Sequence, residues 1–136
     1  MKKILTIALC IIFLASCKEG KTIKPSSAMD TGTTFIRASL DGDFKSAEEL
    51  LLKDTLNGQL FDSYKAMYER LPADKKKNYK DASYNINKYL ELNDSVAIIN
   101  YSNSFMKKPM EIKIVRSNKD WKIDFKYITS GNLPIN

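Results

Sequence analysis

The side chains of this chain that could do acid–base chemistry are its 16 Asp and Glu and its 7 Tyr, because it contains no histidine among its 136 residues. This composition removes the commonest general base and metal ligand, and it excludes serine–histidine and cysteine–histidine nucleophilic schemes. Tyrosine hydroxyls and carboxylates remain. The carboxylate that the sequence places best is Asp124, but strand alternation puts it on the opposite face from Trp121. Pairing with Lys113, Lys122 or Lys126 is the favoured interpretation, and no catalytic residue is predicted.

Aromatic side chains could line a small-molecule pocket, because a tyrosine hydroxyl can hydrogen-bond a ligand that its ring contacts. The pocket candidates are Tyr64, Tyr68, Tyr84, Tyr101 and Trp121. At helical and strand spacing, such residues are more often core residues with a hydrogen-bonded tip. Core packing is therefore the favoured interpretation, and a pocket is the alternative.

The sequence lacks a motif for a metal, a phosphate or a nucleic acid. Asp41-Gly42-Asp43 has the start of a calcium loop, but Lys45 and Leu52 stand where further ligands are needed. There is no glycine-rich phosphate loop. The formal net charge of +6 is dispersed along the chain, which gives little support for nucleic-acid binding. We expect no cofactor, no metal and no nucleic-acid partner.

The first 17 residues have the pattern of a cleaved export signal that ends in a lipid attachment site. Two lysines precede an apolar run over residues 4–14, which is too short to span a bilayer. The ending Ala15-Ser16-Cys17 resembles the lipobox of bacterial lipoproteins, in which a cysteine after a small residue receives a diacylglycerol. The other cysteine, Cys10, follows the bulky Leu9 and does not fit this pattern.

This resemblance implies that residues 1–16 are removed and that the lipid on Cys17 anchors the protein to a membrane of the bacterial cell envelope without spanning it. The outer membrane is the expected location, and its periplasmic and surface faces both stay open. We expect residues 17–29 to consist of the lipidated cysteine and a flexible tether. One domain over residues 30–130 and a tail over 131–136 follow. The mature domain has no cysteine for a disulfide, so packing alone must stabilise it.

Helical spacing dominates the first half of the domain. Apolar residues recur at one-turn spacing over residues 33–40, and Asp41-Gly42-Asp43 then predicts a helix end and a new N-cap. The second predicted helix buries Phe44, Ala47, Leu50 and Leu51. The strongest helical pattern runs from Leu60 to Leu71. It ends before Pro72, which opens a lysine-rich helical connector to Lys80.

After Ala82 the apolar residues alternate with a period of two, which predicts four antiparallel strands. The inner face of the first carries Tyr84, Ile86, Leu90 and Leu92. The second, over residues 95–105, is apolar on both faces, as in a central strand. The inner face of the third carries Met110, Ile112 and Ile114, and that of the fourth carries Trp121, Ile123, Phe125 and Tyr127. One apolar and one charged face predict an α+β fold with N-terminal helices packed on one side of a curved four-stranded sheet.

A family resemblance lies in two segments, Phe35–Phe44 with the following Ala47, and Asn118–Asp124. Both are similar to segments of small bacterial lipoproteins of unknown function in the nuclear transport factor 2-like (cystatin-like) superfamily. The resemblance covers residues 30–128. It implies a cone, in which the sheet wraps around the N-terminal helices and leaves a pocket between them. Enzymes of this superfamily that isomerise or dehydrate small molecules often use Asp, Tyr or His inside the cone.

The favoured function is a non-catalytic envelope lipoprotein that binds a small apolar ligand or another envelope protein, because a complete fold pattern carries no catalytic constellation. One alternative is a small isomerase or dehydratase that uses a tyrosine and a carboxylate inside the cone. The other is a structural module that forms a homodimer through the outer face of the sheet. That face is predicted to carry Lys113, Val115, Lys122, Asp124 and Lys126.

Overall fold

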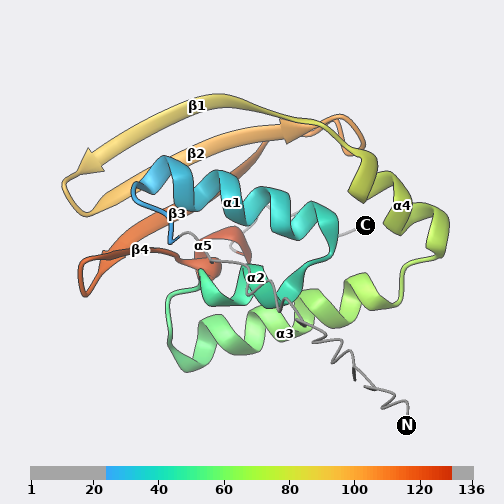
Figure 1. Ribbon diagram of the computed structural model, residues 1–136, viewed down its shortest axis with the longest axis horizontal. Coiled ribbons are helices and arrows are strands. Elements are labelled where there is room, and N and C mark those ends of the chain that lie inside the picture. Colours follow the sequence, from blue (N-terminus) through green and yellow to red (C-terminus); the bar gives the residue numbers. More distant parts are fainter. Residues whose placement is uncertain (1–23, 130–136) are drawn as a thin grey trace, which may run out of the picture.

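The sheet has four antiparallel strands in the order β1-β2-β3-β4, so neighbours in sequence are neighbours in space (Figure 1). The computed structural model describes residues 24–129. Its strands are β1 (Tyr84–Asn93), β2 (Val96–Asn103), β3 (Met110–Ser117) and β4 (Asp120–Ile123). The predicted α+β class with a four-stranded antiparallel sheet is confirmed.

Five helices accompany this sheet in the described part of the chain. They are α1 (Ala28–Asp41), α2 (Phe44–Glu49), α3 (Thr55–Glu69), α4 (Ala73–Asp81) and α5 (Phe125–Thr129). The first begins at Ala28 rather than at Thr33, because the Ser27 side chain caps it by accepting a hydrogen bond from the backbone N–H of Asp30. The last two residues of the expected tether, Ala28 and Met29, therefore lie in a helix.

The turn between α1 and α2 follows the predicted chemistry. Gly42 has a φ of 73°, which a glycine adopts without steric strain. The backbone N–H of Asp43 donates to the carbonyl of Ala38 at 2.9 Å, which closes the end of α1. The Asp43 side chain then accepts a hydrogen bond from the backbone N–H of Ser46 at 3.2 Å. Both predicted roles, the helix end at Gly42 and the N-cap at Asp43, are confirmed.

Helix α1 crosses the inner face of the sheet and contacts β2, β3 and β4. Its buried side includes the predicted stripe of Phe35, Ile36 and Leu40. Against it lie Ile99, Ile112 and Ile114, which are also buried. Gly32 lies on this side of α1, where an added Cβ would stand 2.3 Å from Cδ1 of Ile99 on β2. The packing of α1 on the sheet therefore forms the centre of the core.

A cluster of phenylalanine rings attaches α2, α3 and α5 to this core. The ring centroid of Phe61 on α3 lies 5.3 Å from that of Phe125 and 5.9 Å from that of Phe44, in edge-on geometry. Phe35 of α1 lies 6.4 Å from Phe61. Edge-to-face ring pairs of this kind add to the stability gained from burial. The two short helices α2 and α5 are held by these rings.

Helix α4 is polar, as predicted, and has no fully buried residue. Arg37 of α1 holds its C-terminal end. The guanidinium donates to the backbone carbonyls of Lys80 at 3.0 Å and Ala82 at 2.9 Å. This contact places the lysine-rich helix beside the end of the sheet where β2 finishes.

The first strand departs from the predicted alternation. Its pairing with β2 shifts around Asn87, which is the extra residue of a β-bulge. Beyond the bulge Tyr89 packs against the core, whereas Leu90 and Leu92 are 40% and 59% exposed. The prediction that Leu90 and Leu92 lie on the inner face is wrong, because the bulge exchanges the two faces of the strand.

The last strand is shorter than predicted. β4 ends at Ile123, and Phe125 and Tyr127 lie in α5, so the prediction that a strand carries them is wrong. The backbone N–H of Lys126 donates to the side-chain oxygen of Asn57 at 2.9 Å instead of continuing the sheet ladder. Phe125 is buried in α5 as it would be on the inner face of a longer β4. The alternation of apolar and polar residues alone does not distinguish a continued strand from this short helix.

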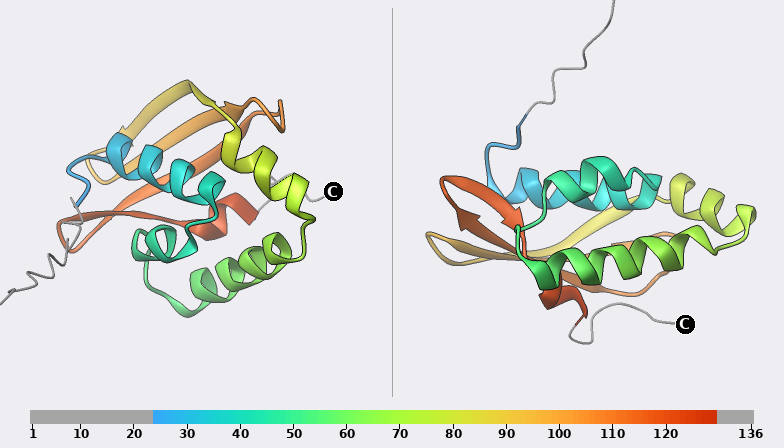
Figure 2. Two further views of the ribbon diagram at one scale, coloured as in Figure 1. Left: turned by 45° about the vertical axis from the view of Figure 1, so that its right-hand side comes forward. Right: turned by 90° about the horizontal axis from the view of Figure 1, so that it is seen from below.

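The two edges of the sheet differ. At the β4 edge, the backbone N–H of Ile123 donates to the carbonyl of Leu50 at 2.8 Å, and that of Leu52 donates to the carbonyl of Ile123 at 2.9 Å. The segment after α2 therefore covers this edge. At the opposite edge, β1 pairs only with β2 within residues 24–129. Figures 1 and 2 show β1 and β2 bending over α1.

Candidate functional site

A small cavity of about 60 Å³ lies between the helices and the end of the sheet where β2 finishes and β3 starts. The helices contribute Ile36, Ser39, Leu40, Tyr64, Met67 and Tyr79. The sheet and its connecting loop contribute Tyr101, Asn103, Met106 and Met110. We refer to this space as the tyrosine cavity.

Three tyrosines in the wall of the tyrosine cavity are held in the protonated form. Burial raises the pKa of Tyr64 well above its ordinary value of 10.0, and the neighbouring Tyr101 raises it further. Burial is also the main cause of the raised pKa of Tyr101 and of Tyr79. Near neutral pH these groups can hydrogen-bond a ligand, but they cannot act as bases.

Part of the hydrogen-bonding capacity of the wall is unused. Ser39 Oγ is buried and has no hydrogen-bond partner among the described residues. The Tyr79 hydroxyl donates to Sδ of Met106 at 3.2 Å, and a thioether sulfur is a weak acceptor. A polar atom of a ligand would give either hydroxyl a better partner.

The rest of the wall is apolar and includes Met67, Met106 and Met110. A volume of about 60 Å³ corresponds to roughly two water molecules in the liquid. Methionine side chains are flexible and adapt to irregular shapes, and Met67 is 41% exposed. The cavity therefore suits one end of a small, mainly apolar molecule and can widen by a methionine rotation.

The structure brings together two of the five predicted pocket residues, Tyr64 and Tyr101. Tyr68 lies beside the cavity, where its ring packs 4.9 Å from Phe44. Tyr84 lines a shallow groove along α1 together with Arg37. Trp121 lies at the opposite end of the sheet, next to the β3–β4 turn. Four of the five residues therefore line three separate places rather than one pocket, and Tyr68 lines none of the three.

Sequence reasoning missed Tyr79, Ser39 and Met106 as cavity residues. Tyr79 lies in the lysine-rich helix, whose pattern gave no buried face. Tyr79 is nevertheless the one aromatic residue of that helix, and this could have indicated that it packs against the rest of the domain. Ser39 lines the cavity from α1 but is a polar residue outside the apolar stripe of that helix, so no sequence signal marks it as a cavity residue.

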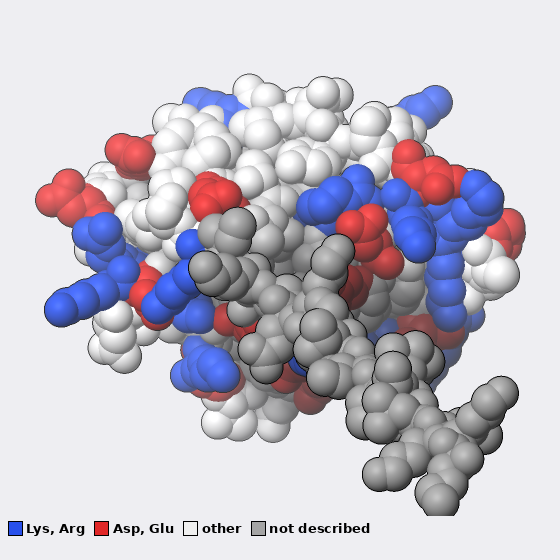
Figure 3. All heavy atoms as spheres, in the orientation of Figure 1, with Lys and Arg blue, Asp and Glu red and all other residues white. Residues whose placement is uncertain are grey.

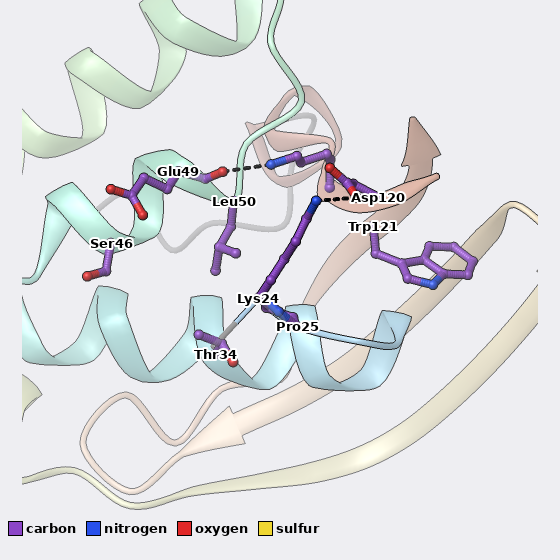
Figure 4. Close-up of a pocket in the computed structure, with 9 residues that line it drawn as sticks. Lys24, Pro25, Thr34, Ser46, Glu49, Leu50, Asp120 and Trp121 are labelled. Carbon is purple, nitrogen blue, oxygen red and sulfur yellow. Dashed lines mark hydrogen bonds and ion pairs between the residues drawn. The ribbon is translucent and has the colours of Figure 1, made fainter. Parts of the chain in front are cut away.

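A larger hollow of about 480 Å³ lies at the other end of the sheet, between α1, α2 and β4. Figure 4 shows Lys24 extended across it toward Asp120. The Lys24 ammonium lies 2.7 Å from the Asp120 carboxylate and, through this hydrogen bond, lowers the pKa of Asp120. Trp121 stands at the margin, with the Arg116 guanidinium 4.9 Å from its ring centroid. The hollow is thus bridged by the first described residue of the chain.

Asp124, the carboxylate singled out from the sequence, is paired with two lysines. Its oxygens lie 3.6 Å from Nζ of Lys126 and 3.8 Å from Nζ of Lys113, which confirms the predicted pairing. Asp124 does not line the tyrosine cavity. Lys126, predicted on the outer face of the sheet, lies in α5.

Within residues 24–129, no group of three or more His, Cys, Asp or Glu side chains could hold a metal ion. None of the helices in this described part is both long enough and apolar enough to cross a membrane. The predicted signal segment, Cys10, the lipidation site Cys17 and the tail 131–136 lie outside the described residues.

Comparison with models of known protein families gives no match to this chain. A search among curated proteins also finds no significant match.

Proposed function

We propose that this chain is a bacterial envelope lipoprotein, anchored through Cys17, whose domain binds a small apolar ligand in the tyrosine cavity without transforming it. The observation that carries the proposal is the cavity itself, an apolar space with three tyrosines and the buried Ser39 hydroxyl in its wall. The ending Ala15-Ser16-Cys17 supports the lipid anchor. A binding module attached to a membrane needs both features.

We further propose that the domain is a cone of the nuclear transport factor 2-like kind. In support, β1 and β2 bend over α1 (Figure 2), and the tyrosine cavity lies between the helices and the sheet. The segment from Phe35 to Phe44, which carries the resemblance, forms the second half of α1 and its turn into α2.

The wall of the cavity favours binding over catalysis. Its polar groups are hydroxyls and one amide, and within residues 24–129 no carboxylate lines it. The tyrosines keep their protons near neutral pH, because the ordinary pKa of 10.0 already lies well above it and burial raises the pKa of Tyr64, Tyr101 and Tyr79 further. A proton-transfer enzyme needs a base with a pKa near the working pH. Hydrogen-bond donors in an apolar wall instead orient a ligand that carries one polar group.

Native mass spectrometry tests the proposal on the lipid-free form beginning at Lys18, purified from its own envelope compartment. We expect a reproducible added mass of a small organic molecule. The Ser39→Leu variant should lose this mass, because the new side chain fills the cavity. Ser63→Leu is the matched control, since Ser63 is exposed on α3, and it should retain the mass. A bare protein, or equal retention by both variants, would contradict ligand binding in the tyrosine cavity.

A further inference from the structure

The chain enters the domain against the β3–β4 hairpin. Lys24 pairs with Asp120 at 2.7 Å. Two residues later the backbone N–H of Ser26 donates to the Asp30 carboxylate at 3.0 Å, and Ser27 caps α1. These contacts fix the point at which the preceding segment leaves the domain, beside the hairpin.

The distance from this point to the proposed lipid anchor is short. Seven Cα steps separate Cys17 from Lys24, and at most about 3.6 Å per residue limits their separation to roughly 25 Å. That reach is only a little more than the length of α1, whose 14 residues span about 21 Å. If Cys17 is acylated, as the proposed function requires, the surface around Lys24 cannot lie far from the bilayer.

The chemistry of this surface suits an anionic membrane. Arg116 and Lys119 are exposed on the hairpin, whereas the ammonium of Lys122 on β4 donates to the backbone carbonyl of Glu49 at 2.8 Å. Asp120, the acid after Lys119, is already paired with Lys24. Figure 3 shows Lys and Arg side chains at the end of the molecule where the hairpin projects, with acidic side chains among them, and a second basic group at the opposite end. Basic residues near a bilayer attract anionic headgroups.

Trp121 adds a second feature of membrane contact at the same place. It is partly exposed on β4, and the Arg116 guanidinium lies 4.9 Å from its ring centroid. Tryptophan prefers the interface between headgroups and hydrocarbon, because one edge of its ring system is polar. Arg116 and Trp121 therefore offer an anionic lipid surface a cation and an aromatic ring side by side.

We propose that the end of the domain formed by the β3–β4 hairpin lies against an anionic lipid bilayer, with Trp121 at the interface. This inference rests on the proposed lipid anchor at Cys17. It also orients the tyrosine cavity. Tyr101 in the cavity wall and Val96 at the hairpin end are five residues apart on β2, a distance of about 17 Å. The cavity then faces away from the membrane, and its ligand arrives from the aqueous side.

The test uses the protein extracted from its own membranes and reconstituted in vesicles of phosphatidylcholine and phosphatidylglycerol with brominated acyl chains. Trp121 is the only tryptophan of the chain, so its fluorescence reports on this end alone. We expect strong quenching by the brominated lipid and weak quenching by acrylamide added to the water. The opposite pattern would overturn the proposed orientation.

A matched reporter at the other end is Phe105→Trp in a Trp121→Phe background, because Phe105 lies in the loop after β2 beside Tyr79. This variant should show the reverse pattern, with acrylamide the stronger quencher. Equal quenching by the lipid at both ends would contradict a single orientation. Circular dichroism checks that the double variant folds. The quenching measurement on the natural Trp121 does not depend on this variant.

Charge is tested with Lys119→Gln, whose side chain is exposed on the hairpin, and with the control Lys108→Gln at the other end. A basic residue at the surface of an anionic bilayer contributes about five-fold in binding. We expect Lys119→Gln to raise the acrylamide quenching of Trp121 on anionic vesicles and Lys108→Gln to leave it unchanged. Equal effects of the two variants would overturn the role of the hairpin charges.

Mass spectrometry of the N-terminal peptide separates the two proposals. A peptide without lipid on Cys17 overturns both the anchor and the orientation. A lipidated peptide together with an unquenched Trp121 overturns the orientation only, and leaves the proposed anchor and cavity in place.

Discussion

Gly32 on α1 lies so close to β2 that a Cβ added to it would stand 2.3 Å from Cδ1 of Ile99. The same Cβ would stand 3.3 Å from Cδ1 of Ile112. Both isoleucines are buried, at 0% and 1% exposure, so their side chains have little room to move away. The absence of a side chain at Gly32 therefore sets how closely α1 approaches the sheet.

We predict that Gly32→Ala lowers the free energy of unfolding. Alanine favours a helix by about 1 kcal/mol over glycine, but overpacking a filled core costs roughly 1–3 kcal/mol. The expected net loss is about 1 kcal/mol, measured by urea denaturation. Gly58→Ala on α3 is the control, because an added Cβ there meets nothing within 4 Å. It should raise stability by about 1 kcal/mol, and a gain at Gly32 would show that α1 can shift freely.

A second prediction concerns Asn57, a fully buried amide that joins α3 to α5. Its side chain donates to the Asp54 carboxylate at 2.8 Å and accepts from the backbone N–H of Lys126 at 2.9 Å. Asn57→Leu removes the oxygen that accepts from this partly buried N–H and the amide that donates to Asp54, and changes of this kind cost about 1–3 kcal/mol. We expect a loss of this size in urea denaturation.

The control for Asn57 is Asn87→Leu, since Asn87 is exposed on β1 although it hydrogen-bonds Asn100 at 3.0 Å. Its expected effect is below roughly 0.5 kcal/mol. Similar losses at both positions would mean that the Asn57 amide does not hold α5 in place.

Local chemistry made much of the fold predictable from the sequence. The turn at Gly42 and the cap at Asp43 depend only on residues within one helical turn, and both are confirmed. The start of α1 was not predicted, because the first turn after Ser27 has little apolar character. The N-cap Ser27 therefore lies several residues before the apolar spacing that indicates the helix. Capping hydrogen bonds therefore proved a better guide than hydrophobic periodicity at this boundary.

Features that depend on contacts across the chain were not predictable. The bulge at Asn87 reverses the faces of β1, and the sequence alternation carries no mark of the extra residue. The end of β4 depends on Asn57, which lies far from Lys126 in the chain. The tyrosine cavity likewise depends on Tyr79, which Arg37 brings into position by holding the end of α4. Only Tyr64 and Tyr101 were recognisable beforehand.

Alkaline pH should destabilise the domain through its buried tyrosines. Burial raises the pKa of Tyr64 and Tyr101 above the ordinary 10.0. Above pH 10 the unfolded chain therefore loses these protons while the folded chain keeps them. Stability is fully present below pH 10 and falls as the pH rises, by up to about 1.4 kcal/mol per pH unit for each such tyrosine.

The measurement is urea denaturation between pH 8 and pH 12, with tyrosinate absorbance recorded in parallel. Tyr101→Phe should reduce the slope above pH 10, because the phenyl ring has no proton to lose. Tyr127→Phe is the comparison, because burial and the hydrogen bond to Glu111 also raise the pKa of Tyr127, but by less than burial raises the pKa of Tyr101, so it should change the slope less. An unchanged slope in Tyr101→Phe would mean that its hydroxyl ionises as readily in the folded state as in the unfolded one.

The β3–β4 turn offers a stabilising substitution. Asn118 and Lys119 both have positive φ angles, 49° and 72°, and they join the paired residues Ser117 and Asp120. Two positive φ angles in a two-residue hairpin loop favour asparagine followed by glycine. A lysine in the left-handed region costs about 1–2 kcal/mol, which a glycine at the same position does not. Part of the stability gained by the replacement is lost again, because glycine is more flexible in the unfolded chain.

We therefore expect Lys119→Gly to raise the free energy of unfolding by about 0.5–1 kcal/mol. Lys119→Ala keeps the strain and should give no gain, so the pair separates backbone conformation from loss of the lysine charge. Lys108→Gly, at an exposed position without a positive φ, should lower stability by a similar amount. A gain of the same size in Lys119→Ala would assign the effect to charge rather than to the turn, because alanine tolerates a positive φ no better than lysine does.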